Sequence, residues 1–517
     1  MKIERSKNAF RNIIFGSLLK IYQIIVPFLM RSAMIYFMGV KYLGLSSLFT
    51  SILQILNLTE LGVGSAMVFS MYKPIAENNV KKICSLMALY KIYYRWIGLV
   101  IGVIGIALTP FLPHLVKGTW PQEINIYVLY MLNLATTVAS YWLYAYKNCL
   151  FSAHQRNDAI SKVTLVTQTF QYGMQFIVIV FLKDYYLYVI VALATQVITN
   201  LAIAYAADKT YPEYKPSKSL DKNLIKDINQ RIKDLFTSKV GAVVLNSTDT
   251  VVISAFLGLE MLAIYQNYFF ILSSITTLVA VFFHSSAAGI GNSLVVENEE
   301  KNFAILKQFT LLIAWIATIC SCCFLCLFQP FMRMWVGEEL MLNFSVVICF
   351  CIYYYVSEIN QLLNTFKDAA GIWHEDRWRP LITSMVNLGL NLIMVNFCGI
   401  YGILLSTILA MLIVGMPWLL HNLFTVLFSR KYLKEYLIKL GIYVSVAFLS
   451  TVLCYWVCQF VYFSEFLTLI FRVVICLIIS NGVLYIMFRK TEEFRYLINI
   501  LDNLFKGKLP IKQWLLK

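Results

Sequence analysis

Long apolar runs recur along almost the whole chain, and they constrain its fold more than any other feature. Each run holds about twenty or more mainly apolar residues, the length that an α-helix needs to cross a membrane. A transmembrane β-barrel would show short segments of alternating hydrophobicity instead. We therefore predict an all-α polytopic membrane protein of about fourteen transmembrane helices. The predicted spans are 10–38, 43–72, 83–112, 124–152, 163–182, 185–207, 235–257, 262–290, 303–328, 343–366, 380–397, 400–428, 438–462 and 466–488.

The charge distribution indicates how the chain is oriented. Hydrophobic residues make up 60% of the sequence and charged residues 14%, far from the composition of a soluble protein, yet the net charge is +16. With the amino terminus in the cytoplasm, most Lys and Arg fall in cytoplasmic loops, and the carboxyl terminus is cytoplasmic as well. The charge is thus a topology signal and an attraction to anionic lipid, and we expect no nucleic-acid binding. We expect the basic first segment to be retained, because the apolar run after it is too long for a signal peptide.

Matching residues recur at an offset of 219 or 220 residues, which predicts a duplicated chain. The matches keep their order over more than half of the repeat, as a duplication requires. Two repeats of six helices each would be related by an axis along the membrane normal. The matched pairs include Lys20 with Lys239, Lys147 with Lys367, and His154 with His374.

The repeat divides the chain into lobes. We predict an N-lobe of helices 1–6 over residues 1–207, a cytoplasmic linker over 208–234 and a C-lobe of helices 7–12 over 235–428. Helices 13 and 14, within 429–488, lie outside the repeat. Apolar residues at helical spacing in 489–517 predict an amphipathic tail on the cytoplasmic membrane surface.

Basic residues inside the predicted spans are candidate cavity residues, because charges are costly in a membrane. Lys20, Lys239, Lys91 and Arg95 lie in the cytoplasmic third of their helices, where long side chains also reach the headgroups without any function. Against that alternative, Lys20 and Lys239 match in the repeat, and Lys20 and Arg31 share one helix face about three turns apart. Such a face predicts a cationic cavity that attracts phosphate or pyrophosphate groups.

Acidic residues inside the spans are harder to explain by reach to the headgroups, because carboxylate side chains are short. Glu60, Asp249 and Glu358 are therefore candidates for coupling or gating. The repeat places Asp249 beside the counterpart of Arg31, so we predict that these two residues pair across a central cavity; the alternative is an ion pair that only joins the lobes. Asn246 adds polar lining to the same helix. Glu60 either caps the backbone near the glycines that follow it or titrates as a proton site, and the sequence leaves both open.

A dense cysteine motif, CSCCFLC, lies inside an apolar helix. Its cysteines point around much of the helix and have no His or acidic residue nearby, so we interpret them as core residues. We expect no metal and no cofactor. The motif contains Cys320, Cys322, Cys323 and Cys326.

Three segments resemble Wzx-type polysaccharide flippases of the multidrug, oligosaccharidyl-lipid and polysaccharide (MOP) exporter superfamily. They are TELGVGSAMVFSMYKPIAENNVKKI at 59–83, STDTVVISAFLGLEMLAIYQ at 247–266, and the stretch at 368–413 that begins DAAGIWHEDRWRP. The resemblance implies a V-shaped, two-lobe flippase in the bacterial cell membrane. It would carry undecaprenyl-pyrophosphate-linked oligosaccharide repeat units from the cytoplasmic to the outer leaflet, for lipopolysaccharide, capsule or exopolysaccharide synthesis.

The implied partners are the lipid-linked oligosaccharide, membrane lipids, and the polysaccharide polymerase and chain-length machinery. Two other members of the superfamily are alternatives: a peptidoglycan-precursor flippase and a cation-coupled drug exporter. Drug exporters usually have twelve helices, so the extra pair at 438–488 favours a lipid-linked cargo. An enzyme such as a glycan polymerase is disfavoured, because the predicted outside loops are short and no nucleophile, base and orienting group occur together.

Overall fold

The computed structural model describes residues 5–60, 62–217 and 222–504, and in these ranges every regular element is a helix. Among the described residues, eleven helices are long and apolar enough to cross a membrane, and one bent pair brings the number to twelve. Two shorter apolar helices, Val40–Leu56 and Val243–Leu257, fall within the second and seventh predicted spans. The prediction of an all-α polytopic fold is confirmed, and each predicted span coincides with a helix or a helix pair.

Contacts divide the chain into two compact units, Met1–Ala263 and Ile264–Lys517. This boundary lies near the start of α10, so α9 groups with the helices of the predicted N-lobe. The lobes predicted from the repeat begin and end elsewhere, and that division stays a prediction. The predicted linker is partly helical, because α8 continues to Thr210 and α9 begins at Lys222.

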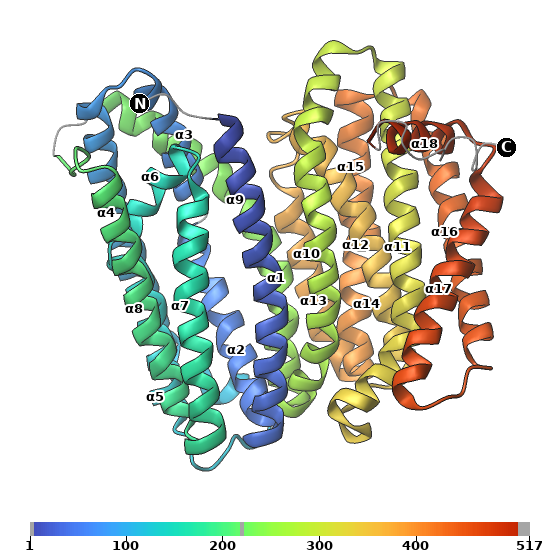
Figure 1. The fold of residues 1–517 in the computed structure, drawn as a ribbon, viewed down its shortest axis with the longest axis horizontal. Coiled ribbons are helices and arrows are strands. Elements are labelled where there is room, and N and C mark those ends of the chain that lie inside the picture. The colour runs from blue at the N-terminus through green and yellow to red at the C-terminus, as the bar shows by residue number, and fades with distance from the viewer. Residues whose placement is uncertain (1–4, 61, 218–221, 505–517) are drawn as a thin grey trace. The chain divides into compact units, whose positions relative to one another are not determined.

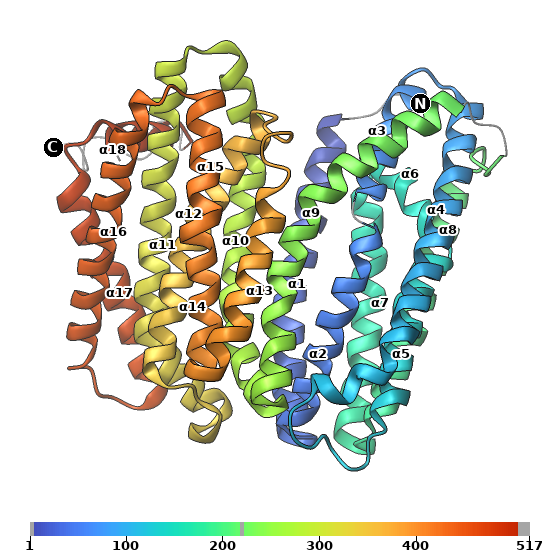
Figure 2. The ribbon, with the colours of Figure 1, turned by 180° about the vertical axis from the view of Figure 1, so that it is seen from behind.

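The first unit is built from long helices joined to shorter helical segments (Figures 1 and 2). Helix α1 packs on α7, α4 packs on α5, and α8 packs on both α5 and α7. Helix α2 packs on α9. The helices are α1 (Arg5–Phe37), α2 (Val40–Leu56), η1 (Asn57–Glu60), α3 (Val63–Ala76), α4 (Val80–Leu108), η2 (Thr109–Leu115), α5 (Ile126–Trp142), η3 (Ala145–Lys147), α6 (Asn148–Ala153), α7 (Asn157–Ile177), η4 (Val178–Leu182), α8 (Tyr185–Thr210) and α9 (Lys222–Leu257).

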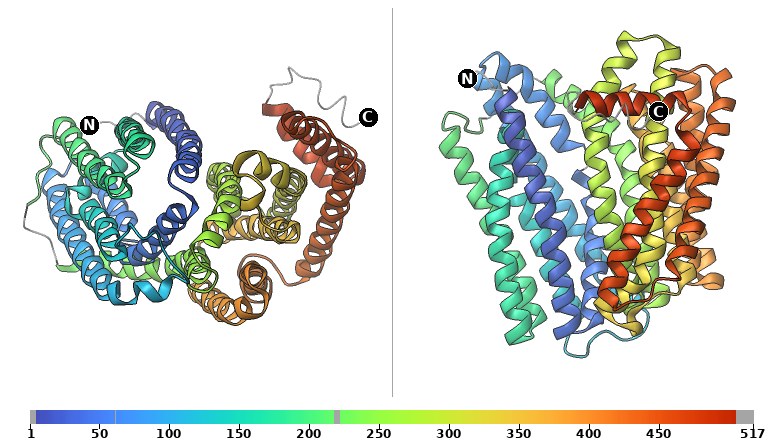
Figure 3. Two further views of the ribbon diagram at one scale, coloured as in Figure 1. Left: turned by 90° about the horizontal axis from the view of Figure 1, so that it is seen from below. Right: turned by 45° about the vertical axis from the view of Figure 1, so that its right-hand side comes forward.

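In the second unit, α11 is the central element and packs on α12, α16, α17 and α18. Helices α16 and α17 run side by side along one edge of this unit (Figure 3). The helices are α10 (Leu259–Val296), α11 (Glu299–Val336), η5 (Glu338–Leu340), α12 (Phe344–Ala369), α13 (Arg379–Cys398), α14 (Ile400–Ala410), η6 (Met411–Gly415), α15 (Met416–Asn422), η7 (Leu423–Leu427), α16 (Lys431–Cys458), α17 (Glu465–Phe488) and α18 (Glu492–Leu504).

Helix α18 is the described part of the predicted amphipathic tail, and it follows α17 and packs on α11 (Figure 1). Its apolar face is buried against other helices of the second unit. Phe494 stacks on Trp315 of α11, with ring centroids 5.6 Å apart. Glu493 forms an ion pair with Lys439 of α16. Residues 505–517 of the predicted tail lie outside the described residues, and its place on the membrane surface stays a prediction.

A close backbone approach fixes α2 within the first unit. The backbone at Gly44 lies so near Leu259 that an added Cβ would collide with the Leu259 carbonyl group. Small residues allow such approaches between membrane helices, where dispersion and weak polar contacts replace the hydrophobic effect as the driving force.

Candidate functional site

A break in the second span places Glu60 at the start of the candidate site. Helix α2 ends at Leu56, and the tight turn η1 carries the chain to Glu60. Gly62, which precedes α3, has φ of 92°, a conformation that glycine adopts without steric cost. The break thus puts a carboxylate between two helical segments of one span.

Tyrosine hydroxyls bind both oxygens of the Glu60 carboxylate. Tyr94 of α4 donates to Oε1 at 2.6 Å, and Tyr141 of α5 donates to Oε2 at 2.7 Å. Tyr90, one turn before Tyr94, donates in turn to the Tyr94 hydroxyl at 2.7 Å. Two arms of tyrosine donors therefore meet on one half-buried carboxylate: Tyr90 and Tyr94 in series on one oxygen, and Tyr141 on the other.

This carboxylate lines a cavity of about 540 Å³ within the first unit, the Glu60 pocket. Its wall is mixed, with hydroxyl, amide and thiol groups beside aromatic rings. A Cβ added at Gly64 would lie 3.2 Å from the Tyr90 hydroxyl, so a larger residue there would press on this tyrosine. The lining residues are Glu60, Gly64, Ser65, Val68, Phe69, Tyr72, Tyr90, Tyr94, Asn148, Cys149 and Ser152.

The Glu60 pocket has the chemistry to accept a cation, a proton or the hydroxyl groups of a sugar. A carboxylate within a membrane span attracts positive charge, and its oxygens accept hydrogen bonds from hydroxyl groups. Tyrosine and phenylalanine faces suit the apolar faces of sugars. The hydrogen bonds that the structure gives the Glu60 carboxylate go to side chains of α4 and α5. Both roles considered for Glu60, a backbone cap and a proton site, stay predictions.

The predicted cationic residues of α1 lie in different surroundings. Lys20 is exposed, whereas Arg31 is half-buried and interacts electrostatically with Tyr188 of α8. Asp249 is 9% exposed on α9, in the same unit as Arg31. The pairing of Arg31 with Asp249 stays a prediction.

Two predicted cavity residues of α9, Lys239 and Asn246, have side chains outside the described residues. On α4, Lys91 lies with its Nζ 5.8 Å from the centroid of the Tyr146 ring of η3. Arg95 is exposed, and its carbonyl accepts a hydrogen bond from Trp142 Nε1 at 3.1 Å. Neither Lys91 nor Arg95 is among the residues that line the Glu60 pocket, and their role in a cavity stays a prediction.

Glu358 lies in the second unit, on α12, and is only 2% exposed. Its Oε1 atom has no hydrogen-bond partner within the described part of the chain. A buried carboxyl oxygen without a hydrogen-bond partner is costly in an apolar environment. The predicted coupling or gating role of Glu358 remains a prediction.

Lys147 and Lys367, one of the two lysine pairs matched by the repeat, are both buried in ion pairs near helix ends. Lys147 is 8% exposed and binds Asp208 at 2.6 Å, and Lys367 is 5% exposed and binds Asp368 at 2.6 Å. Each of these two lysines thus has a structural role in its own unit. The matched histidines differ: His154 is buried and stacks on Tyr211, whereas His374 is exposed.

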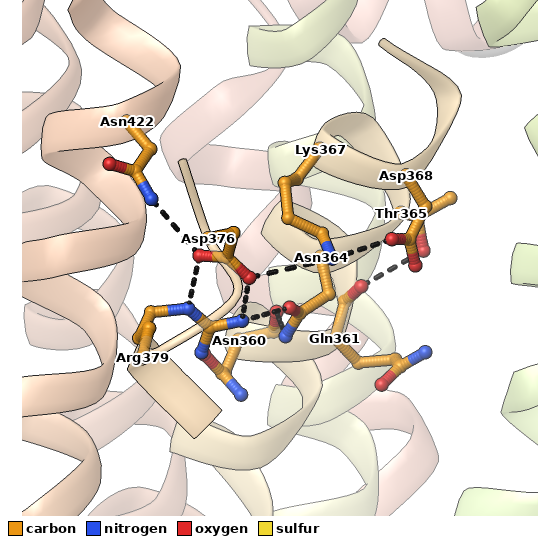
Figure 4. A network of polar contacts seen from close by, with 9 residues as sticks. All are labelled: Asn360, Gln361, Asn364, Thr365, Lys367, Asp368, Asp376, Arg379 and Asn422. Carbon is orange, nitrogen blue, oxygen red and sulfur yellow. Dashed lines mark hydrogen bonds and ion pairs between the residues drawn. The ribbon is translucent and has the colours of Figure 1, made fainter. Parts of the chain in front are cut away.

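Around Lys367, a polar network joins the end of α12 to the start of α13 (Figure 4). Asp376 is at the centre of this network. Its carboxylate accepts hydrogen bonds from Arg379 Nε at 2.6 Å and from Asn422 Nδ2 at 3.0 Å, and it lies 3.5 Å from Lys367 Nζ. Arg379 also donates to Asn364 at 2.7 Å. Because each charge has an opposite partner, this network is best explained as a brace of the α12–α13 connection.

Sequence reasoning identified Glu60 but missed its tyrosine partners. They are ordinary aromatic residues in a chain with 32 tyrosines, so composition does not distinguish them. The available signal was the four-residue spacing of Tyr90 and Tyr94, which places both on one face of a helix. Tyr141 carries no such signal, because its role depends on how α5 packs on α4.

Comparisons with known proteins place the fold. No protein-family profile and no curated protein matches the chain. Among solved structures, a lipid II flippase MurJ in an inward closed conformation is similar with a TM-score of 0.65 and 15% identity, over 92% of this chain and 99% of that one. An inward-facing multidrug resistance MATE family transporter of the MOP superfamily has a TM-score of 0.61 and 14% identity, over 81% and 99%. A MOP superfamily transporter from Pyrococcus furiosus has a TM-score of 0.52 and 12% identity, over 83% and 95%. The chain has the fold of MOP superfamily transporters and flippases.

Proposed function

We propose that the protein is a flippase that moves undecaprenyl-pyrophosphate-linked oligosaccharide repeat units from the cytoplasmic to the outer leaflet of the bacterial cell membrane. It would act by alternating access, in the synthesis of a cell-surface polysaccharide. The partners that this function requires are the lipid-linked substrate, membrane lipids, and the enzymes that polymerise the exported units.

The observation that carries the proposal is how far each similar structure extends over the chain. The lipid II flippase matches 92% of it and the multidrug transporter 81%. The difference, 11% of 517 residues, is comparable with the combined length of α16 and α17, which have 28 and 24 residues. We infer that α16 and α17 are the helices that the multidrug transporter lacks, and this assignment favours a lipid-linked cargo over a soluble drug.

The surfaces of α16 and α17 support the same cargo. Both helices expose many large apolar side chains along their length, among them Phe448, Trp456 and Phe471. Such a surface contacts acyl or polyprenyl chains at little cost, because it need not be removed from water. A second support is the Glu60 pocket, whose mixture of hydroxyl groups and aromatic rings suits a glycan.

Basic residues of α1 and α4 would receive the pyrophosphate. Arg31 presents a fork of donors that matches phosphate oxygens, and Lys20 and Lys91 add positive charge in the same unit. We expect Arg31→Ala with Lys20→Ala to impair export while membrane insertion is preserved. Normal export by the double variant would mean that these side chains only extend to the lipid headgroups and do not bind the substrate.

The experiment that tests the function is deletion of the gene, followed by assignment of the lipid-linked oligosaccharide to one leaflet with a membrane-impermeant glycan-modifying enzyme. We expect the intermediate to accumulate in the cytoplasmic leaflet and surface polysaccharide to fall. Unchanged surface polysaccharide with altered drug tolerance would overturn the proposal. Accumulation of a peptidoglycan precursor would replace it with the function of the lipid II flippase.

A further inference from the structure

Six cysteines from three helices gather in the second unit, although they are far apart in the sequence. All are free thiols, and they fill the interface that α11 forms with α16 and α17. The cluster contains Cys322, Cys323 and Cys326 of α11, Cys454 and Cys458 of α16, and Cys476 of α17.

Three of these thiols, one from each helix, converge. The sulfur atoms of Cys326, Cys458 and Cys476 all lie within 4.8 Å of one another, and the Sγ atoms of Cys458 and Cys476 are 4.0 Å apart. Each of the three residues is at most 2% exposed. Apolar packing alone places no restriction on where sulfur atoms point, so convergence from three helices calls for a further explanation.

We propose that Cys326, Cys458 and Cys476 bind a monovalent copper ion in a closed three-sulfur site. Thiolate sulfur is the ligand type that selects soft metal ions such as Cu⁺. An ion in the plane of three sulfurs, with metal–sulfur bonds of about 2.3 Å, separates those sulfurs by about 4 Å. The 4.0 Å separation of the Cys458 and Cys476 sulfurs meets this requirement, and Cys326 Sγ lies within 4.8 Å of both.

Coordination number favours Cu⁺ over Zn²⁺. Structural zinc sites are almost always tetrahedral with four ligands. Within the described residues, the group of ligand atoms that lie within 4.8 Å of one another consists of three cysteine sulfurs and includes no histidine nitrogen or carboxylate oxygen. Cu⁺ is stable with three sulfur ligands, so the site is complete for copper and one ligand short for zinc.

Charge balance is provided by Arg472 of α17. Its Nη1 donates to the Cys326 carbonyl at 3.2 Å, and its positive charge acts on Cys458. Cu⁺ and Arg472 together balance two thiolates, while the third cysteine binds as a thiol; two protons leave when the ion enters. This neutral arrangement avoids the cost of an uncompensated charge in an apolar bundle.

A metal at this place would tie α16 and α17, the two helices outside the repeat, to the central helix α11. Because metal that binds only the folded form stabilises it, copper would raise the stability of this edge of the second unit. The site is independent of the proposed flippase function and would be present whatever the cargo is.

The test uses the full-length protein in detergent, reduced, loaded with Cu⁺ and freed of excess metal by a Cu⁺ chelator. We expect about one copper ion per protein and an X-ray absorption spectrum with sulfur ligands only. The triple variant Cys326→Ser, Cys458→Ser and Cys476→Ser should lose the ion. A matched triple variant at three other buried cysteines, Cys84→Ser, Cys349→Ser and Cys351→Ser, should keep it.

Arg472→Leu keeps every sulfur and provides a second arm if the triple variant fails to fold. We expect it to bind Cu⁺ about 10–100-fold more weakly, as for other residues that support metal ligands. Equal copper content in the two triple variants, nitrogen or oxygen ligands in the spectrum, retention of Zn²⁺ in preference to Cu⁺, or a Cys458–Cys476 disulfide in the reduced protein would each overturn the proposal.

Discussion

The hydrogen bond from Tyr141 to Glu60 gives a quantitative prediction for the Glu60 pocket. Tyr141→Phe removes one hydroxyl and leaves Glu60 Oε2 without its donor at 2.7 Å. A hydrogen bond to a charged acceptor contributes about 1.5–3 kcal/mol to stability. We therefore expect Tyr141→Phe to lower the free energy of unfolding by an amount in this range.

The same substitution should matter less when the acceptor is neutral. Glu60→Gln keeps the shape of the side chain but removes its charge, and interhelical hydrogen bonds between neutral groups in membranes average about 0.6 kcal/mol. In the Glu60→Gln background, Tyr141→Phe should therefore cost about 0.6 kcal/mol. The two substitutions should then show a coupling energy of about 0.9–2.4 kcal/mol in a double-mutant cycle.

The assay is unfolding of the four proteins in mixed micelles, followed by tryptophan fluorescence. Tyr127→Phe, at an exposed tyrosine of the same helix, is the matched control and should leave stability unchanged. Additive effects of the Glu60 and Tyr141 substitutions would refute the reasoning, because they would mean that the two side chains do not interact in the membrane protein.

Three further predictions concern packing, a buried charge and pH. Gly44→Val should destabilise the first unit by about 1–3 kcal/mol in micelle unfolding, because its side chain meets the Leu259 backbone; wild-type stability would show that α2 is free to move. Asp376→Ala should cost about 3–5 kcal/mol and reduce the folded yield, since it leaves Arg379 buried without its ion-pair partner; a loss below about 1 kcal/mol would contradict a bracing role. Burial lowers the pKa of His154 from its ordinary value of 6.5, so the unfolded state binds the proton more readily and stability should fall as pH drops through about 6.5. The melting temperature should fall more between about pH 7 and pH 5 for the wild type than for His154→Phe, and equal losses would argue against this origin.

The sequence predicted the membrane fold because span length follows from bilayer thickness alone. Glu60 was identified for a related reason. Placing a short acidic side chain inside a membrane span costs free energy whatever helices surround it. These arguments need no knowledge of which helices touch. The break after Glu60 was also visible, in the glycines at positions 62 and 64.

Features that depend on helix packing could not be predicted in this way. Tyr141 became a partner of Glu60 only through the contact of α5 with α4. The CSCCFLC motif was interpreted as apolar core because no ligand lay nearby in the sequence, whereas Cys458 and Cys476 reach it from helices more than a hundred residues away. Hydrophobic periodicity tells which face of a helix is apolar, but it leaves open which helix covers that face.

Transport in a reconstituted system tests the central claim most directly. The purified protein would be placed in vesicles with a fluorescent undecaprenyl-pyrophosphate-linked oligosaccharide, and the fraction accessible to a membrane-impermeant quencher would be followed over time. We predict that the labelled lipid crosses the bilayer faster in vesicles that contain the protein than in protein-free vesicles, and that Arg31→Ala slows this movement. Equal rates with and without the protein, in vesicles where it is correctly folded, would contradict the proposed function.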